Sequence, residues 1–477
     1  MLEGLEVSEV LKSQLLRVET FRCDAEFFAK AAIRVAATIE AKAEKFQKLA
    51  EIGVEVDASA FYPSIESSYG LGDLPFLRVA NVNRTINYES ATTIPLALLA
   101  SHKTLKQVKP NDIVLTKGGS VARVGFVTRK AAVSRDLIFV NSSVLDVVDA
   151  NFLYLYFLTT FANSLLIRSS SQSVQAHLTL TLVKEIPCFK ATQVFKNELF
   201  RVVKASEATQ SQSLKEYAHS EKILADTIGF SNLGASERSI NVKSFKESFG
   251  STGRLDAEHY QPKYDQLHKT LSAYSGGTTT VDSLAFEITN GAEVREYQES
   301  GTPYLRIGDL KLLDIDAASV VYIDPVGAEK GLEKIGLCVG DVLLSRSGSL
   351  AVSAVVESTW ENALISSHLI RLRIRDTRID PYFLALFFMT FPGKMQIQKW
   401  SNGGVQPEIS QPAVKALIVP ILPMPTQHEI RRLILEARRL RTVAEALLEA
   451  AKRAVEIAIE QDEAAGMAYL AIEGALA

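Results

Sequence analysis

The side chains that could do chemistry in this chain of 477 residues do not fall into any common catalytic spacing. The sequence has no GxxxxGKS/T phosphate loop, no GxGxxG turn opening a helix, no HExxH and no GxSxG. The seven histidines do not pair at ligand spacing, and none lies near two cysteines. A structural zinc ion is therefore not expected.

Two aspartates and two histidines remain as candidate acid–base residues. Asp112 and Asp341 each precede an aliphatic run and could be general bases. A turn residue that caps its own backbone before a strand is the stronger interpretation of both. His177 and His368 have no nucleophile or orienting carboxylate that repeats with them. We expect no catalytic centre in this chain.

Polar loops at matched positions are better candidates, and for binding. One pair of loops is Lys117-Gly118-Gly119-Ser120 with Arg123, and Arg346-Ser347-Gly348-Ser349. Glycine lets a ligand approach the backbone, while Lys, Arg and Ser supply donors for a phosphate or a base edge. A second pair of polar loops, at 169–175 and 400–406, offers Gln175, Asn402 and Gln406. Ordinary solvated turns would have the same composition, so both interpretations stay open.

The elements that must position these loops occur twice. LPFLRVANVN at 74–83 returns as TPYLRIGDLK at 302–311, and DIVL at 112–115 returns as DVLL at 341–344. The RxDAE element at 22–26 returns at 254–258, and Val174-Gln175 returns as Val405-Gln406. Matching elements separated by indels of loop size indicate a duplicated domain. Two similar surfaces suit a bipartite partner, of which double-stranded DNA is the commonest.

Length and composition agree with two globular units joined by connectors. A chain of 477 residues is too long for a single hydrophobic core, and 47% apolar residues are enough to form two cores. A formal charge of −3 neither demands nor forbids a nucleic acid. The N-terminus carries acids instead of a signal peptide, and no apolar run is long enough to span a bilayer. We expect a cytoplasmic protein, without a membrane partner, whose three cysteines are buried and reduced.

Two long helices follow the two copies. A segment from about 193 to 228 has no Pro or Gly and is ended by Gly229; a second runs from about 427 to 465, closed by Gly466. The expected division is a first domain at 1–190, a spacer helix at 191–230, a second domain at 231–425, and a C-terminal helix and tail at 426–477. A helix of about 35 residues spans roughly 50 Å and would act as a ruler.

The second helix has an explicit heptad repeat. Its apolar residues fall at alternating steps of three and four: Ile430, Leu433, Ala437, Leu440, Ala444, Leu447, Ala451, Ala454 and Ala458. Alanine at every other turn lets a partner helix approach closely. The first helix has a weaker seam: Phe200, Val203, Leu214, Tyr217, Leu224 and Ile228. We expect the two helices to pair as an antiparallel coiled coil; the alternative is two unrelated amphipathic helices, each packed on its own domain.

In order, these motifs resemble the DNA-specificity subunit of type I restriction–modification systems. The stretch ILPMPTQHEIRRL at 421–433 is similar to the family's P-L/I-P-P-L-x-E-Q-x-x-I junction, with Met424 and His428 as departures. The first copy of the junction, IPCFKATQVFKNEL at 186–199, has lost most of its prolines. The resemblance covers nearly the whole chain. It implies an α+β fold of two similar mixed target-recognition domains in tandem, separated and followed by long helices.

The resemblance also implies a non-catalytic subunit for phage defence. Each domain would read a few base pairs of double-stranded DNA, and the helices would be a spacer and a docking surface. Two methyltransferase subunits would dock there, bind S-adenosylmethionine and methylate adenine N6; a translocating endonuclease subunit would join them. The candidate DNA-binding residues are Lys117, Ser120, Arg123 and Gln175 in the first domain, and Arg346, Ser349, Asn402 and Gln406 in the second.

Two other functions remain open at this point. The chain could be the recognition subunit of a related phage-defence methylation system with a different methyltransferase. It could also be a two-domain protein-interaction scaffold that binds no DNA. Sequence-dependent DNA retention separates the scaffold from the other two functions, and the identity of co-purifying subunits separates those two. The recognised bases do not follow from the sequence, because loops also read DNA through water and shape.

Overall fold

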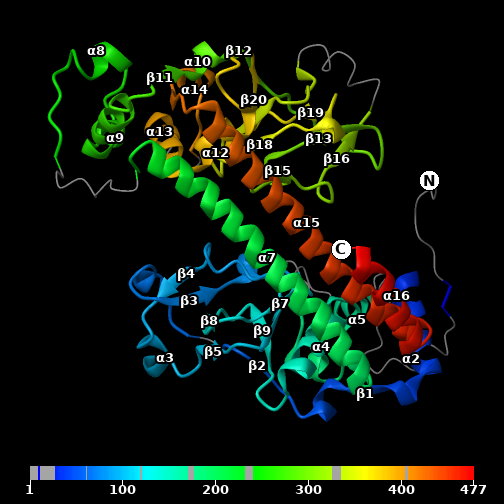
Figure 1. Cartoon of the computed structure of the whole chain (residues 1–477). Coiled ribbons are helices and arrows are strands. Elements are labelled where there is room, and N and C mark those ends of the chain that lie inside the picture. The colour runs from blue at the N-terminus through cyan, green and yellow to red at the C-terminus, as the bar shows by residue number, and fades with distance from the viewer. Residues whose placement is uncertain are drawn as a thin grey trace. The chain divides into compact units, whose positions relative to one another are not determined.

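The computed structural model describes residues 9–10, 27–60, 62–118, 121–169, 177–230, 240–324, 335–402 and 407–476. The chain forms two compact units (Figure 1). Unit 1 comprises Met1–Thr209 and Val443–Ala477, and unit 2 comprises Gln210–Thr442. Each unit therefore contains part of both long helices, whereas the division expected from the sequence separates the helices from the globular parts.

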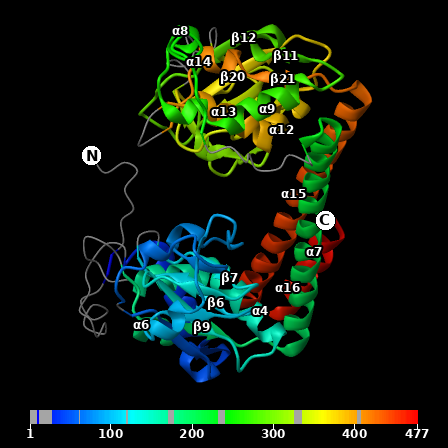
Figure 2. The same cartoon turned by 90° about the vertical axis from the view of Figure 1, so that its left-hand side faces the viewer.

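Among the described residues, unit 1 has two four-stranded sheets and a two-stranded one; Figure 2 labels β6 (Ile113–Thr116), β7 (Val124–Phe126) and β9 (Leu137–Asn141) of the first sheet. The first sheet has the order β2-β9-β6-β7: Glu55–Ala58, Leu137–Asn141, Ile113–Thr116 and Val124–Phe126. The second has the order β4-β3-β8-β5: Thr92–Ile94, Leu74–Leu77, Ala131–Val133 and Lys106–Val108. The small sheet pairs β1 (Phe46–Lys48) with β10 (Pro187–Phe189). Only β3 and β8 are parallel; the other described strand pairs of this unit are antiparallel.

Unit 2 repeats this topology with different residues. Its four-stranded sheet has the order β12-β20-β17-β18: Ala285–Asn290, Leu369–Ile374, Val342–Ser345 and Ser353–Val355. The next has the order β16-β13-β19: Val321–Ile323, Thr302–Leu305 and Leu364–Ile365, with β13 and β19 parallel. Two small pairs complete it: β11 (Thr278–Thr280) with β21 (Ile418–Pro420), and β14 (Leu310–Lys311) with β15 (Asp314–Ile315). The duplication predicted from the motifs is thus present: the order of the first four-stranded sheet recurs in full, and β16-β13-β19 repeats the β4-β3-β8 part of the second sheet.

Equivalent helices fill the core of each unit. In unit 1 these are α4 (Val147–Leu158) and α5 (Thr160–Ser169); in unit 2 they are α12 (Pro381–Met389) and α13 (Phe391–Trp400). Residues 150–157 of α4 and 382–389 of α12 are all buried, as expected of helices that are apolar all round. Each of these two helices begins at an aspartate, Asp146 or Asp380, whose carboxylate caps the first turn.

Shorter helices surround these cores. Unit 1 also has α2 (Lys30–Ala41), α3 (Leu98–Ser101) and α6 (Leu180–Lys184). Unit 2 has α8 (Phe249–Thr252), α9 (Pro262–Ser272), α10 (Val281–Leu284) and α14 (Gln411–Lys415). Within the described ranges no single helix is long and apolar enough to cross a membrane; α4 and α5 reach that composition only together, with a bend of 67° between them.

The long helices α7 (Gln193–Thr227) and α15 (Met424–Glu460) pair antiparallel in both units. In unit 1 the Ser206 hydroxyl donates to the Ala444 carbonyl oxygen, at 2.6 Å. In unit 2 the Ser213 hydroxyl donates to the Ala437 carbonyl oxygen, also at 2.6 Å. A side chain can bond to the backbone of the facing helix only where the helices approach closely. The antiparallel pairing expected from the sequence is confirmed, and the fold is α+β.

The expected seam was right for α15 and partly wrong for α7. Every seam residue of α15 is buried except Leu440, which is half-buried. On α7, however, Leu214 is 54% exposed, while the serines at 206, 213 and 220 are buried. These serines recur every seven residues, which places them on one face of the helix. A pattern built on apolar residues alone misses a seam made of small hydroxyl residues.

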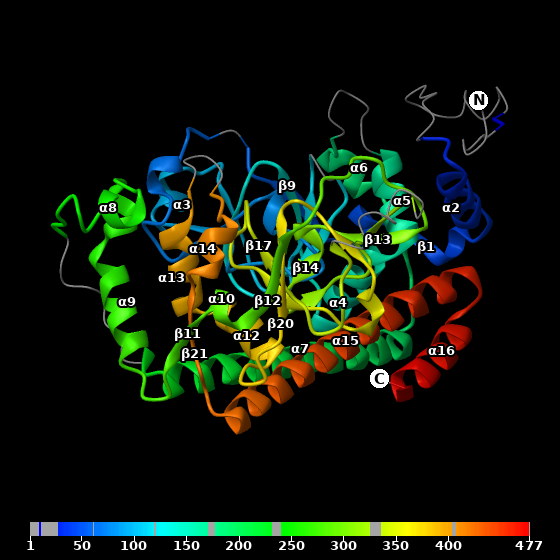
Figure 3. The same ribbon diagram turned by 90° about the horizontal axis from the view of Figure 1, so that it is seen from above.

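The predicted end of the second helix was also wrong. α15 ends at Glu460, and a separate helix α16 runs from Glu463 to Leu476 beside it (Figure 3). The Lys42 ammonium donates to the carbonyl oxygens of Ile459 and Glu460, both at 2.7 Å, and so satisfies the end of α15. The Asp462 carboxylate then accepts the Ala465 N–H at 2.9 Å and caps α16.

Gly466 therefore lies inside α16 and does not end a helix. A Cβ there would lie 2.7 Å from the Ala454 carbonyl oxygen and 3.1 Å from the Phe195 ring. We expect Gly466→Ala to destabilise unit 1 by about 1 kcal/mol, because the clash is with backbone. Gly308→Ala, where a Cβ meets nothing within 4 Å, is the control. Denaturant unfolding that shows the same loss for both variants would contradict this packing.

Two smaller expectations have mixed outcomes. Gly229, with φ of 76°, lies two residues beyond Thr227, the last residue of α7, so the helix ends one residue before the predicted position. Cys188 is buried and burial raises the pKa of its thiol, but Cys338 is exposed, so the expectation of buried cysteines was wrong there. Cys23, the first RxDAE copy and the link at 231–239 lie outside the described residues.

Candidate nucleic-acid interface

In unit 1 the ends of three strands gather at one edge. The parallel strands β3 and β8 end side by side, and the Ser134 N–H donates to the Leu77 carbonyl oxygen at 2.9 Å. The Lys117 N–H, just after β6, donates to the Asp136 carbonyl oxygen at 2.8 Å. The Lys117 carbonyl oxygen accepts the Leu178 N–H at 3.0 Å. We call residues 77–78, 117–118, 134–136 and 177–178 the first edge.

Unit 2 builds the same edge with the same three backbone hydrogen bonds. The Ser366 N–H donates to the Leu305 carbonyl oxygen at 2.9 Å, and the Arg346 N–H donates to the His368 carbonyl oxygen at 2.9 Å. The Arg346 carbonyl oxygen accepts the Ile409 N–H at 2.8 Å. We call residues 305–306, 346–347, 366–368 and 408–409 the second edge. Lys117 and Arg346, both candidates from the sequence, therefore occupy equivalent positions.

The turns beside the two edges are also built alike. The Thr116 hydroxyl accepts the Arg123 N–H at 2.9 Å, and the Ser345 hydroxyl accepts the Val352 N–H at 2.9 Å. Ala122 and Ala351 both have φ of 65°, in the left-handed region that residues other than glycine rarely adopt. The same unusual backbone at Ala122 and Ala351 means that the turns leading into β7 and β18 end in the same way.

The first edge is cationic. Arg78 and Arg135 are exposed, and Lys117 is half-buried. The Arg78 guanidinium lies over the Tyr69 ring, 5.8 Å from its centroid. Within the described ranges, none of these three cations forms an ion pair, and Asp136 is the acidic residue of the edge. Such a surface attracts phosphates.

The second edge is built from the same strand ends, but its two arginines are paired with carboxylates. The Arg346 guanidinium pairs with the Glu408 carboxylate, and the Arg346 side chain is 21% exposed. Arg306 pairs with Asp309 at 3.3 Å, and the hydrogen bonds that it donates to the Asp309 carboxylate raise the pKa of this guanidinium. Both arginines thus already have a carboxylate partner within unit 2.

Polar contacts fix the shape of the second edge. The Ser347 hydroxyl and the His368 Nδ1 lie 2.6 Å apart. Asn402 and Glu408 exchange backbone hydrogen bonds at 2.8 and 2.7 Å, so Asn402 is brought to the same edge as Arg346. Arg346, Asn402, His368 and Glu408 therefore form one cluster of donors and acceptors, which suits the reading of base edges.

The remaining candidates lie in different places. Ser349 is exposed on the turn after Arg346, and its carbonyl oxygen accepts the Ser345 hydroxyl at 2.7 Å. Arg123 is exposed at the start of β7 and lines a cavity. Ser120, Gln175 and Gln406 lie outside the described residues.

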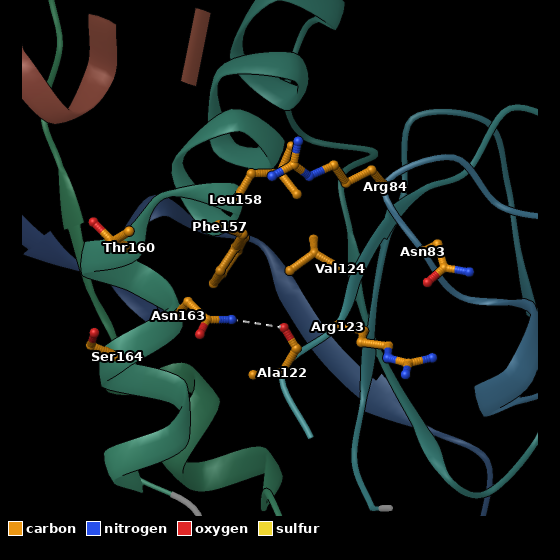
Figure 4. Close-up of a pocket in the computed structure, with 10 residues that line it drawn as sticks. All are labelled: Asn83, Arg84, Ala122, Arg123, Val124, Phe157, Leu158, Thr160, Asn163 and Ser164. Carbon is orange, nitrogen blue, oxygen red and sulfur yellow. Dashed lines mark hydrogen bonds between the residues drawn. The ribbon is translucent and has the colours of Figure 1, made fainter. Parts of the chain in front are cut away.

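The cavity at Arg123 has a volume of about 390 Å³ (Figure 4). Thr160, Asn163 and Ser164 of α5 form one wall, and the Asn163 amide donates to the Ala122 carbonyl oxygen at 3.2 Å. Arg84 lies across from them; its guanidinium pairs with Glu449 at 2.9 Å. Arg84 and Arg123 add polar, basic groups to unit 1, whereas the aligned residues of unit 2 are Leu312 and Val352.

Sequence reasoning missed several edge residues. Arg78 and Arg306 stand inside the quoted LRV and LRI motifs, and aligning VSRDLI at 133–138 with ISSHLI at 365–370 would have found Arg135 and His368. Glu408 gave no local signal, because it meets Arg346 across 62 residues.

The two aspartates considered as general bases are turn caps, as predicted. The Asp112 carboxylate accepts the Lys109 N–H at 2.7 Å and the Ser142 N–H at 3.0 Å. The Asp341 carboxylate accepts the Cys338 N–H at 2.9 Å and pairs with Arg373. In the part of the chain that the structure describes, no three His, Cys, Asp or Glu side chains are placed to hold a metal ion.

Solved structures, but no family models or curated proteins, match this chain. One is the type I restriction–modification S subunit from M. genitalium: 12% identity, TM-score 0.39, 87% of this chain and 94% of that chain covered. Another is the HsdS subunit from Thermoanaerobacter tengcongensis: 13% identity, TM-score 0.25, 87% and 96% covered. A third comes from work on complex assembly of the type I R-M system: 11% identity, TM-score 0.27, 89% and 94% covered. The two named subunits belong to the family that the sequence resembles. With identities and TM-scores this low, the fold assignment rests on the repeat within the chain itself.

Proposed function

We propose that the chain is a sequence-specific recognition subunit for double-stranded DNA, which targets partner methyltransferase subunits to a bipartite, asymmetric site. The globular parts, 1–190 and 231–425, are the two target-recognition domains. Two methyltransferase subunits carry S-adenosylmethionine, and endonuclease subunits complete a type I restriction–modification enzyme.

One observation carries this proposal: the same edge is built twice with different side chains. A duplicated enzyme would need the same chemical groups in both copies. Lys117, Arg135 and His177 of the first edge correspond to Arg346, Ser367 and Glu408 of the second. Two domains that read different base sequences require the same backbone arrangement with different polar side chains.

The proposal is tested by sequencing the methylated bases of the host genome with and without this gene. We expect one bipartite, non-palindromic motif to lose its adenine methylation when the gene is deleted. An unchanged methylation pattern would contradict the proposal and leave the protein-interaction scaffold.

The purified chain itself is expected to transfer no methyl group and to cut no DNA. The reason is that neither copy contains a cofactor or metal motif, and Asp112 and Asp341 are used as backbone caps. The measurement is incorporation of labelled methyl groups into DNA by the chain alone and by the chain with its methyltransferase partners. Methyl transfer by the chain alone would overturn the assignment as a non-catalytic subunit.

A further inference from the structure

The two edges differ in how their cations are compensated. On the first edge Arg78, Lys117 and Arg135 have no ion-pair partner among the described residues. On the second edge Arg306 pairs with Asp309 and Arg346 pairs with Glu408. The two edges have the same backbone arrangement but differ in whether their cations are paired with carboxylates.

From this difference we infer a division of labour, which rests on the proposed function. The uncompensated cations of the first edge supply phosphate contacts and most of the salt-dependent affinity, whereas the Arg346–Glu408 pair of the second edge discriminates bases with little salt dependence. Glu408 is a specificity-determining residue.

The physical reason lies in counterion release. An uncompensated cation that neutralises a DNA phosphate releases about 0.9 counterion, so each such contact steepens the decline of affinity with salt. An arginine that already holds a carboxylate gains little from a phosphate, because the approaching anion must compete with Glu408. Unit 1 should therefore dominate the slope of log K against log salt.

Compensation favours base reading for a second reason. The Glu408 carboxylate holds the Arg346 guanidinium in place. The remaining N–H groups of the guanidinium can donate to guanine O6 or N7. The exposed carboxylate of Glu408 can also accept from cytosine N4 or adenine N6. Arg346 and Glu408 together present donors and an acceptor at fixed positions. In unit 1 the position of Glu408 is taken by His177, which carries no carboxylate.

The experiment measures affinity against salt for the assembled complex. The probes are an unmethylated duplex that carries the motif identified by methylation sequencing, and duplexes in which one half-site of that motif is scrambled. Lys117→Ala and Arg135→Ala should each lower the slope by about 0.9 and weaken binding to all duplexes equally. Arg346→Ala should leave the slope unchanged and reduce discrimination at one half-site.

Glu408→Gln supplies the sharpest variant. The substitution keeps the shape of the side chain but removes the negative charge that pairs with Arg346. The slope of log K against log salt should therefore rise by up to about 0.9, while discrimination at the half-site read by unit 2 falls. Arg378→Ala, an exposed cation paired with Asp376 beyond the end of β20 that lies opposite the second edge, is the control and should change neither quantity.

The outcomes separate this inference from the proposed function. If the native complex prefers its motif but Arg346→Ala lowers the slope as much as Lys117→Ala does, the division of labour is wrong and the proposed function stands. An unchanged slope in Glu408→Gln would also overturn the inference. If the native complex shows no preference among the duplexes, the proposed function fails and the inference fails with it.

Discussion

Ala444→Leu is expected to destabilise unit 1 by about 1–3 kcal/mol, near the upper end of that range, and to weaken the docking of methyltransferase subunits. Ala444 is 3% exposed, and its carbonyl oxygen accepts the Ser206 hydroxyl at 2.6 Å. Three added carbons cannot fit where the helices approach this closely, so α7 and α15 must separate or tilt. Ala451→Leu, at a position with no exposed surface, should behave in the same way.

The chain offers a close control for this overpacking. Ala446 is exposed on the same helix, two residues beyond Ala444, so Ala446→Leu adds the same volume outside the seam. Denaturant unfolding should separate the two variants, and pull-down of the methyltransferase should follow the same order. Equal stability and equal partner binding for Ala444→Leu, Ala451→Leu and Ala446→Leu would contradict a functional coiled coil.

Arg346→Ala is the second large effect. It should cost about 1–3 kcal/mol of binding to the correct site, or roughly 5- to 150-fold in affinity, and should relax specificity in one half-site only. The guanidinium belongs to a cluster with Glu408 and Asn402, so its loss also leaves Glu408 without its partner. If Arg346 touched only phosphate, binding would weaken equally on all sequences and the salt dependence would become shallower.

Lys117, the residue of unit 1 equivalent to Arg346, provides a control for the Arg346→Ala result. Lys117→Ala removes the equivalent residue of the first edge and should leave discrimination at the second half-site intact. Competition binding with duplexes scrambled in one half-site measures both variants. A loss of discrimination in the same half-site for both would mean that the two edges do not read separate sequences.

Local sequence signals predicted the elements well and their ends less well. The absence of Pro and Gly before Gly229 placed α7 within a residue or two, and the repeated motifs predicted two copies of one topology. The continuation of the second helix to Gly466 was wrong because Lys42, more than 400 residues away, binds the last carbonyl oxygens of α15. Asp462 then starts a new helix, and no local pattern contains the first of these contacts.

The candidate site divides in the same way. Lys117 and Arg346 were found because they recur in repeated loops, and the structure places them at equivalent edges. Arg135 and Glu408 were missed because their position depends on pairing between strand ends far apart in sequence. The serines of α7 were missed for a different reason: a hydroxyl that donates to the facing backbone serves a seam as well as a methyl group does.

Competition binding of the assembled complex on targets with each half-site scrambled in turn tests the central claim most directly. Two edges that read different half-sites predict a loss of affinity for either scrambled half, and no loss when only the bases between the half-sites are changed. The two losses should be independent, because each half-site is read by its own unit. Equal affinity for every scrambled duplex would contradict bipartite recognition and the function proposed for this chain.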